Sequence, residues 1–305
     1  MISTGGHLTI LESVDSTNNY AMAMVRAGQA KHGDGFFALE QVQGRGQRGK
    51  TWLTEPGTNI ILTIVLQVQN PLSQQFSLSM AIALAVYDFF AKHAGDETSI
   101  KWPNDIYWRD RKAGGILIES IVRSQESGVE SKSQVRGSEL IVPHPTSVSK
   151  DKQALNANAE TTDSDSINYE KKPVQQELQT PNSELKTERW FVVGMGININ
   201  QTSFAENLRN VVSLKQITGK NWDVIELAKE LCTHVENRYQ QLASGKDLLS
   251  EYNAWLFKKG QTVKFKKDNR VFEAVVNGVD AFGKLRLMTA IEEQFGFGEL
   301  EWVLG

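Results

Sequence analysis

The residues best suited to chemistry lie in a short loop rich in glycine and arginine. Gly44–Thr51 reads Gly-Arg-Gly-Gln-Arg-Gly-Lys-Thr, which matches the P-loop pattern and also the first part of the dinucleotide-binding fingerprint. Glycines let a loop approach a ligand closely, and Arg45, Arg48 and Lys50 supply cationic donors for a phosphate or a carboxylate. Trp52 adds a flat aromatic surface. Alone, the loop fits a bound anion and a solvated basic turn equally well.

Both nucleotide-binding motifs need a helix directly after the loop, because its N-terminus holds the phosphates. Here a Pro56-Gly57 turn comes next, followed by an apolar run at 59–68 that predicts a strand. The sequence also shows no clear Walker-B strand ending in aspartate. A P-loop nucleotidase and a dinucleotide-binding domain are therefore not expected.

A second cluster is Lys101-Trp102-Pro103-Asn104-Asp105, which follows a predicted helix and a short strand. Lys101 and Asp105 bracket a rigid Trp-Pro pair and could serve a nucleotide phosphate and a magnesium ion. Taken alone, the cluster is better explained as an ordinary turn.

A third cluster places Lys112 beside Gly114 and Gly115, at the entrance to a strand predicted at 116–122. Two glycines beside a lysine would let the backbone and the ammonium group meet one ligand. The alternative is a β-bulge marked by glycine.

Neutral polar residues form the remaining candidates. Ser16, Thr17 and Asn18 could hold a polar ligand, although helix capping explains such residues more often. Asn198 stands among strand-type residues in the run 194–200. A buried asparagine needs hydrogen-bond partners, which a ligand or a bend could supply.

Several catalytic classes lack their signatures. The five histidines show no paired metal-binding pattern, and no G-x-S-x-G motif occurs. The single cysteine, Cys232, lies on the apolar face of a helix predicted at 223–243 and is expected in the core. No covalent nucleophile is evident, which suits chemistry driven by positioning and charge stabilisation.

The elements that must position these residues predict an α+β fold. Strands are expected at 8–12, 35–43, 59–68, 116–122 and 190–198, and helices at 20–26, 74–91, 223–243 and 247–257. After residue 257 short strands alternate with glycine turns, at 262–266, 271–279, 285–289 and 298–303, which is typical of a small barrel. We therefore expect a larger domain over 1–257 and a small domain over 258–305.

Residues 124–188 form a polar insertion between two predicted strands. The segment contains no Trp or Phe, and Leu, Ile and Val are only 11 of its 65 residues. Such a composition cannot offset the entropy of ordering, so we expect disorder, apart from a short strand at 139–142. The insertion carries a net charge of −4 and the whole chain a net charge of −3. The rest of the chain therefore carries +1.

Length and composition narrow the class of protein. The 305 residues are 40% hydrophobic and 23% charged, as in ordinary globular proteins. The absence of a basic excess argues against bulk nucleic-acid binding. The sequence shows no signal peptide and no apolar run of about 20 residues. The expectation is a cytoplasmic protein that binds neither nucleic acid nor membrane.

In combination and order, these motifs resemble the biotin–protein ligases, of the biotin–[acetyl-CoA-carboxylase] ligase type. The resemblance covers the whole chain except 124–188 and implies a class II synthetase-like biotin/lipoate ligase domain of mixed or antiparallel sheet flanked by helices, followed by an SH3-like β-barrel. It also implies that biotin and ATP, with Mg²⁺, form biotinyl-5′-adenylate. Biotin then passes to a lysine of a biotin carboxyl carrier protein of acetyl-CoA carboxylase or a related carboxylase. No bound transition metal is expected, and a monomer and a homodimer stay open.

The resemblance also implies site roles. The residues expected to bind biotin are Ser16, Thr17, Asn18, Gln41, Arg45, Gly46, Gln47, Lys112, Gly114 and Gly115. Those expected to bind ATP or the adenylate are Lys50, Trp52, Lys101, Asn104 and Asn198. Catalysis is assigned to Lys112, Arg45 and Arg48, and a metal contact to Asp105.

The sequence departs from the family pattern in two places. Gln47 stands where many members have arginine, which could loosen retention of the adenylate. The first strand begins at Leu8, which leaves no room for the N-terminal helix-turn-helix of bifunctional members, so a repressor role is not expected. Two alternatives remain: a lipoate or octanoate ligase or transferase of the same fold, and a non-catalytic sensor of biotin or its adenylate.

Overall fold

The structure is a computed structural model that describes residues 6–68, 75–124, 187–206, 208 and 210–304. All of these described residues belong to one compact unit of the chain. The strand predicted at 139–142 and the predicted disorder of the insertion lie outside the described residues.

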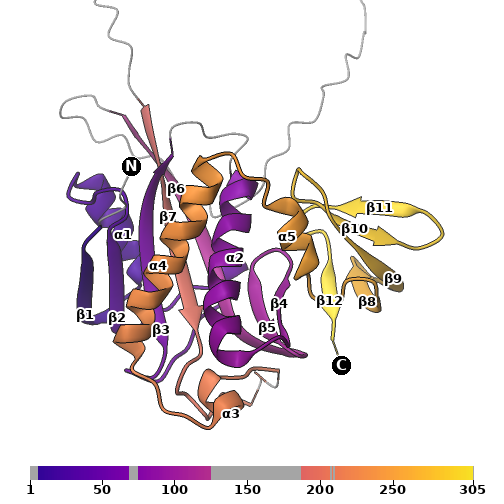
Figure 1. Ribbon diagram of the computed structural model, residues 1–305, viewed down its shortest axis with the longest axis horizontal. Coiled ribbons are helices and arrows are strands. Elements are labelled where there is room, and N and C mark those ends of the chain that lie inside the picture. Colours follow the sequence, from indigo (N-terminus) through magenta and orange to yellow (C-terminus); the bar gives the residue numbers. More distant parts are fainter. Residues whose placement is uncertain (1–5, 69–74, 125–186, 207, 209, 305) are drawn as a thin grey trace, which may run out of the picture. The chain divides into compact units, whose positions relative to one another are not determined.

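A seven-stranded mixed sheet, in the order β1-β2-β3-β7-β6-β5-β4, forms the centre of this unit (Figure 1). Its strands are β1 (Leu8–Val14), β2 (Gly35–Gln41), β3 (Ile60–Val68), β4 (Thr98–Lys101), β5 (Asp105–Trp108), β6 (Arg111–Ser124) and β7 (Thr187–Ile197). β1 and β2 run parallel, whereas the other neighbouring pairs are antiparallel. The expected α+β class with a mixed sheet is confirmed.

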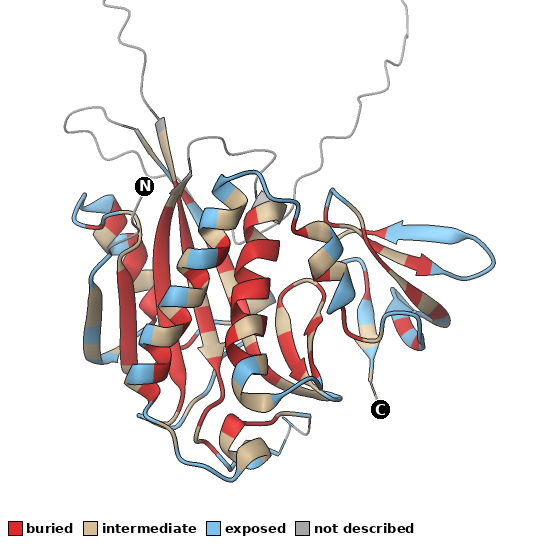
Figure 2. Cartoon of the chain, in the orientation of Figure 1, coloured by how far each residue is buried: buried red, intermediate tan, exposed pale blue. Residues whose placement is uncertain are grey.

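Helices cover both faces of this sheet, and the alternation along each strand assigns residues to a face. On β3, Leu62 and Ile64 point into the large core beneath α2 (Gln75–Ala94) and α4 (Val224–Ala243). Val65 points the other way, into a smaller core beneath α1 (Thr17–Arg26). The central strands are accordingly buried along most of their length (Figure 2).

A second sheet follows the helix α5 (Leu249–Ala254) and has the order β11-β10-β9-β8-β12. Its strands are β8 (Thr262–Lys267), β9 (Arg270–Val279), β10 (Leu285–Met288), β11 (Glu292–Phe295) and β12 (Glu301–Val303), all antiparallel. The Trp102 indole donates a 2.9 Å hydrogen bond to the Gly283 carbonyl. This bond links the β4–β5 turn to the second sheet.

The predicted elements are present, with shifted ends and three omissions. β5, β11 and the short helix α3 (Leu214–Thr218) were not predicted. The strands beside the insertion are longer than expected, because Ser124 still pairs with Thr187 in the β6–β7 hairpin. The helix predicted at 247–257 is shorter, since only 249–254 are helical.

The glycine–arginine loop leads into no α-helix. A 3₁₀ turn at Gln47–Gly49 lies inside the loop, and the next regular element is β3. The exclusion of both nucleotide-binding motifs is therefore confirmed. Among the described helices, none has the length and apolar character needed to cross a membrane.

Candidate functional site

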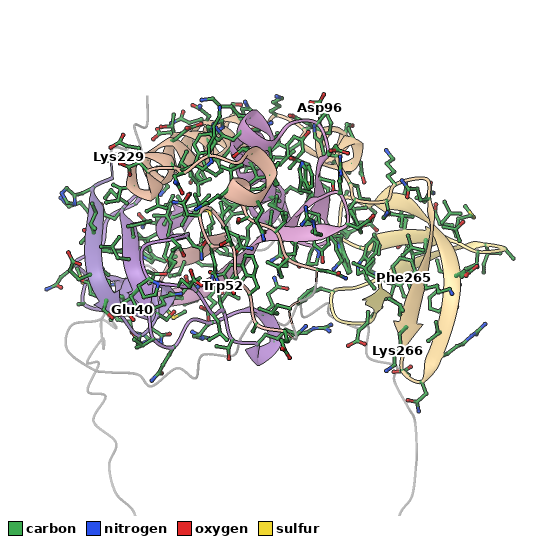
Figure 3. The ribbon with its side chains drawn as sticks, turned by 90° about the horizontal axis from the view of Figure 1, so that it is seen from below. Glu40, Trp52, Asp96, Lys229, Phe265 and Lys266 are labelled. Carbon is green, nitrogen blue, oxygen red and sulfur yellow. The ribbon has the colours of Figure 1, made fainter. Side chains whose placement is uncertain are left out.

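A cavity of about 480 Å³ opens on the α1 face of the large sheet. Its walls come from the start of α1, the glycine–arginine loop, the central strands, the β4–β5 turn and the end of the second sheet. Figure 3 shows Trp52 on the side opposite Asp96 and Lys229, which mark the side of α2 and α4. The cavity therefore lies away from the main helical layer.

Glycines on β7 make room for this cavity. Gly194 and Gly196 occupy the face where Val192 lies in the small core. A Cβ at Gly194 would lie 2.3 Å from the Asn18 Oδ1 atom, and one at Gly196 would lie 2.6 Å from the Trp52 ring. Both approaches are shorter than any van der Waals contact, so these positions need glycine for Asn18 and Trp52 to pack as they do.

A β-bulge places Lys112 in the cavity. Tyr107 of β5 pairs with Lys112, whereas Ile106 pairs with Gly114, so Ala113 is the extra residue on β6. The extra residue brings Lys112 and Gly115, three positions apart, onto the same face of the sheet. The predicted bulge is thus present, and it also directs the lysine toward the site.

One end of the cavity is neutral and polar. The Gln41 Oε1 atom accepts from the Thr17 backbone N–H at 2.7 Å and lies 3.0 Å from the Thr17 hydroxyl. The Thr63 hydroxyl lies 2.7 Å from Asn18 Oδ1. Thr17 and Asn18 are both buried, and the Ser16 side chain makes no capping hydrogen bond. Helix capping therefore does not explain this Ser-Thr-Asn run.

Hydrogen bonds fix what each amide at this end can offer a ligand. The Asn18 Nδ2 group donates to Glu119 Oε2 at 2.9 Å, so rotating the amide would place two oxygens against each other. The remaining lone pair of Asn18 Oδ1 is therefore an acceptor. Gln41 uses Oε1 for Thr17, which leaves its Nε2 group as a donor.

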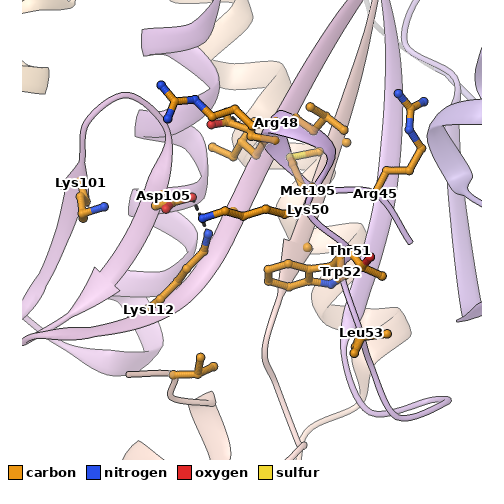
Figure 4. Close-up of a pocket in the computed structure, with 18 of the residues that line it drawn as sticks. Arg45, Arg48, Lys50, Thr51, Trp52, Leu53, Lys101, Asp105, Lys112 and Met195 are labelled. Carbon is orange, nitrogen blue, oxygen red and sulfur yellow. Dashed lines mark hydrogen bonds and ion pairs between the residues drawn. The ribbon is translucent and has the colours of Figure 1, made fainter. Parts of the chain in front are cut away.

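The other end of the cavity is cationic. Lys112 Nζ lies 2.8 Å from Asp105 Oδ1, and both side chains are partly buried. Lys101 Nζ lies over the rings of Tyr107 and Trp302, at 5.2 and 5.4 Å from their centroids. Figure 4 shows Lys50 and Lys101 near the ion pair of Lys112 with Asp105, so three lysines gather around one carboxylate.

This excess of charge acts on the pKa of Lys101. Burial lowers that pKa, and the positive charges of Lys112 and Lys50 lower it further, while Asp105 opposes them. An anionic ligand would relieve this repulsion. The end of the cavity therefore favours phosphate or carboxylate groups.

Aromatic rings line the space between the two ends. Lys112 Nζ lies 5.8 Å from the centroid of Trp52, and the Arg48 guanidinium lies 5.2 Å from that of Phe297. Arg48 has a φ of 55°, in the left-handed region. The indole N–H groups of Trp52 and Trp302 are buried without a hydrogen-bond partner among the described residues. Both residues line the cavity with their rings, whereas these two nitrogens are themselves covered by protein atoms.

The structure brings most of the predicted site residues to this one cavity. Those that line it are Ser16, Thr17, Asn18, Gln41, Arg45, Gly46, Gln47, Arg48, Lys50, Trp52, Lys101, Asp105, Lys112, Gly115 and Asn198. Two predicted residues do not line it. Asn104 is buried and donates to the Ile116 carbonyl at 2.7 Å. Gly114 instead lets β6 approach β7, since a Cβ there would lie 2.9 Å from the Gly196 carbonyl oxygen.

The surroundings of Asp105 do not fit a resident metal ion. One of its oxygens is paired with Lys112, and two further lysines lie beside it. Among the described residues no group of three or more His, Cys, Asp or Glu side chains could hold a metal. The metal contact predicted at Asp105 stays a prediction, because a linear pattern does not show which cation a carboxylate faces.

Sequence reasoning missed several residues that shape the site. Thr63 supports Asn18, Glu119 supports both Asn18 and Arg45, and Phe297 and Trp302 form a wall. Of these residues, only Glu119 could have been recognised from the sequence. It is a lone carboxylate in the apolar strand predicted at 116–122, and such a group needs buried partners.

Comparison with known proteins places this geometry in context. Residues 10–131 match the model of the Biotin/lipoate A/B protein ligase family. The bifunctional ligase/repressor BirA of Escherichia coli is 36% identical over 115 residues, which are 38% of this chain and 35% of that protein. The biotin–[acetyl-CoA-carboxylase] ligase of Paracoccus denitrificans is 38% identical over 113 residues, 36% of this chain and 46% of that protein. The matched segments thus span less than half of these relatives.

The fold comparison covers more of the chain. A biotin protein ligase from Aquifex aeolicus, solved in complex with biotin and ATP, superimposes with a TM-score of 0.66. The match covers 98% of this chain and 99% of that one, at 19% sequence identity, and so establishes the shared fold. The chain thus matches the model of the Biotin/lipoate A/B protein ligase family over residues 10–131 and shares the fold of a biotin protein ligase.

Proposed function

We propose that the protein is an ATP-dependent ligase that forms biotinyl-5′-adenylate and transfers biotin to a lysine of a biotin carboxyl carrier protein. The observation that carries this proposal is one cavity with two chemically different ends. A neutral end presents one oriented acceptor and one oriented donor, and the other end presents three lysines. Biotin has a neutral ureido ring at one end and a carboxylate at the other, which suits that pair of ends.

The neutral end supports recognition of the ureido ring. Asn18 Oδ1 can accept from a ring N–H, and Gln41 Nε2 can donate to a ring oxygen. Both side chains are held by partners in the ligand-free structure. A preorganised site of this kind loses little entropy on binding.

The cationic end supports attack of a carboxylate on the α-phosphate of ATP. A carboxylate oxygen would form a bond to the phosphorus while the bond to pyrophosphate breaks. The nucleophile is already ionised at neutral pH, so no general base is needed. Lys112, Lys101 and Lys50 would stabilise the negative charge that gathers on the phosphoryl oxygens.

The second step needs little from the protein beyond exclusion of water and retention of the anhydride. The carrier's lysine amine would attack the acyl carbon, the bond to AMP would break, and the amine would lose a proton. We assign retention of the adenylate to the loop residues Arg45, Arg48 and Gln47, and to Trp52 beside the nucleotide.

Magnesium enters this scheme with ATP, as part of the substrate. Mg²⁺ is usually held by phosphates, waters and few protein groups. The lysine-rich surroundings of Asp105 suit phosphate oxygens better than a second cation.

Lipoate is disfavoured as the substrate by the neutral end of the cavity. Its dithiolane ring offers no counterpart to the buried amide of Asn18 and the partly buried amide of Gln41, which would lose hydrogen bonds to water without replacement. A non-catalytic sensor of biotin or its adenylate would use the same two ends of the cavity, so release of pyrophosphate is the observation that separates it from a ligase.

Mass spectrometry of an apo carrier domain tests the proposal. The protein is incubated with MgATP and biotin, or with MgATP and lipoate, while pyrophosphate release is recorded. We expect a biotin-sized mass gain on one carrier lysine that requires ATP. Lipoyl transfer would contradict the choice of substrate, and biotin binding without pyrophosphate release would point to the sensor.

A further inference from the structure

One buried carboxylate touches both the neutral end and the glycine–arginine loop. Glu119 lies on β6 and is 5% exposed. Its Oε2 atom accepts from Asn18 Nδ2 at 2.9 Å, and its Oε1 atom lies 2.8 Å from Arg45 Nη2. The second guanidinium nitrogen of Arg45 lies 3.4 Å from Oε2, so the arginine faces the carboxylate with both ends of its fork.

Glu119 does not itself line the cavity, whereas both of its partners do. On one side, it fixes the amide of Asn18 so that Oδ1 faces away from the carboxylate. On the other, it holds Arg45, which also donates to Asn19 Oδ1 at 2.9 Å. The loop is thereby attached to the start of α1 through a charge that water reaches poorly.

The two attachments depend on each other. A buried carboxylate needs its hydrogen bonds, so loss of Arg45 would leave its charge poorly compensated. The Arg45 side chain is 40% exposed, against 4% for Glu119, so the partner on the loop is the one that solvent reaches. A change in the loop would therefore be felt at the amide that reads the ligand's ring.

We propose that Glu119 is a positioning residue that couples recognition of the ligand's ring to closure of the glycine–arginine loop. This inference rests on the proposed function. It predicts that Glu119 determines selectivity for a ring N–H through Asn18, and retention of the adenylate through Arg45.

Glu119→Gln is the informative substitution, because it keeps size and shape. Glutamine has one carboxamide oxygen, so it can accept from Asn18 or from Arg45 but not fully from both. Calorimetry would measure binding of biotin and of N-methylated biotin, which lacks a ring N–H, without ATP. We expect affinity for biotin to fall about tenfold, and the preference for biotin over the methylated analogue to shrink by a similar factor.

The ratio between the two ligands separates positioning from general damage. A variant that is merely less stable would lose affinity for both ligands equally and keep the ratio. Glu230→Gln is the matched control. Glu230 is a partly buried glutamate that contacts Lys92, His93 and His234, and it lies outside the cavity lining. Its variant should keep both affinities.

Arg45→Met tests the other half of the coupling and does not depend on folding of the Glu119 variant. Adenylate formed in the site should dissociate at least several-fold faster, and the preference for biotin over the methylated analogue should also shrink, because Glu119 loses the partner that compensates its charge. An unchanged ratio in a folded Glu119→Gln protein, or unchanged adenylate dissociation in Arg45→Met, would overturn the inference. Failure of the wild-type protein to bind biotin would instead overturn the proposed function, and the inference with it.

Discussion

Removing the charge of Lys112 is the most direct test of the proposed chemistry. Lys112 Nζ lies 2.8 Å from Asp105 and is carried into the cavity by the bulge at Ala113. Lys112→Met keeps the aliphatic chain that faces Trp52 and removes the charge alone. Loss of one preorganised donor to a developing anion slows catalysis about 100- to 1,000-fold, or roughly 3 kcal/mol. We expect adenylate formation to slow by that factor.

The effect on stability should be much smaller. The Lys112 and Asp105 side chains are 30% and 22% exposed, so solvent screens their ion pair. Such a pair contributes about 1 kcal/mol at most, which corresponds to a melting temperature lower by roughly 2–4 °C. The remaining lysines near Asp105 keep its charge partly compensated.

The chain offers a closely matched control in Lys258→Met. Lys258 Nζ lies 2.5 Å from Asp110 and 5.3 Å from the centroid of Phe257, and its side chain is 26% exposed. It therefore has a carboxylate and an aromatic ring as partners, as Lys112 does, but it does not line the cavity. This variant should show a similar thermal shift and normal activity.

The assay is biotin-dependent release of pyrophosphate under single-turnover conditions, with melting temperatures recorded for both variants. Supplying synthetic biotinyl-5′-adenylate and the apo carrier measures the second step separately. That step should be far less affected in Lys112→Met. A folded Lys112→Met protein that forms adenylate within threefold of the wild-type rate would refute the role of the lysine.

Three further predictions concern the fold around the site. Replacing residues 125–186 with a short turn should leave the melting temperature and adenylate synthesis nearly unchanged, because the paired ends of β6 and β7 already meet; a large thermal loss would contradict this. Gly196→Ala should displace Trp52 and raise the KM for ATP with little change for biotin, and an unchanged KM would argue against the indole's role. The hydrogen bond from Arg238 holds the pKa of Glu251 below its usual 4.5. The ionised Glu251 therefore contributes its full stabilisation above pH 4.5, and this contribution is lost as the pH falls through the lowered pKa. In Glu251→Gln, the free energy of unfolding measured against pH should fall less steeply in this acid range.

Local sequence patterns were enough to predict the helices and strands whose apolar residues recur with a strong period. The apolar runs of β3 and α2 and the capped amphipathic helix α4 appear in the structure near their predicted ends. β5 and β11 were missed because each is only four residues long and carries little alternation. Their pairing depends on neighbouring strands, which no local window contains.

The residues of the candidate site also fall into those that local sequence patterns could predict and those that they could not. Residues in distinctive motifs, such as Arg45 and Lys112, were found because their types and spacing carry chemistry on their own. Thr63 and Trp302 were missed because they are ordinary residues whose importance comes from what they face. Asn104 shows the opposite case, since its side chain lies inside a motif but hydrogen-bonds to the backbone of β6 and does not line the cavity.

The wall formed by residues 297–302 has a consequence for synthesis of the protein. Every other lining segment has been made once residue 211 is added, so 86 residues separate that point from Phe297. At about 5–20 residues per second, a growing chain spends roughly 4–17 s with the cavity open on that side. During this interval Arg48 has no Phe297 ring to pack against. The order of segments along the chain thus delays the assembled cavity until translation of the domain is nearly finished.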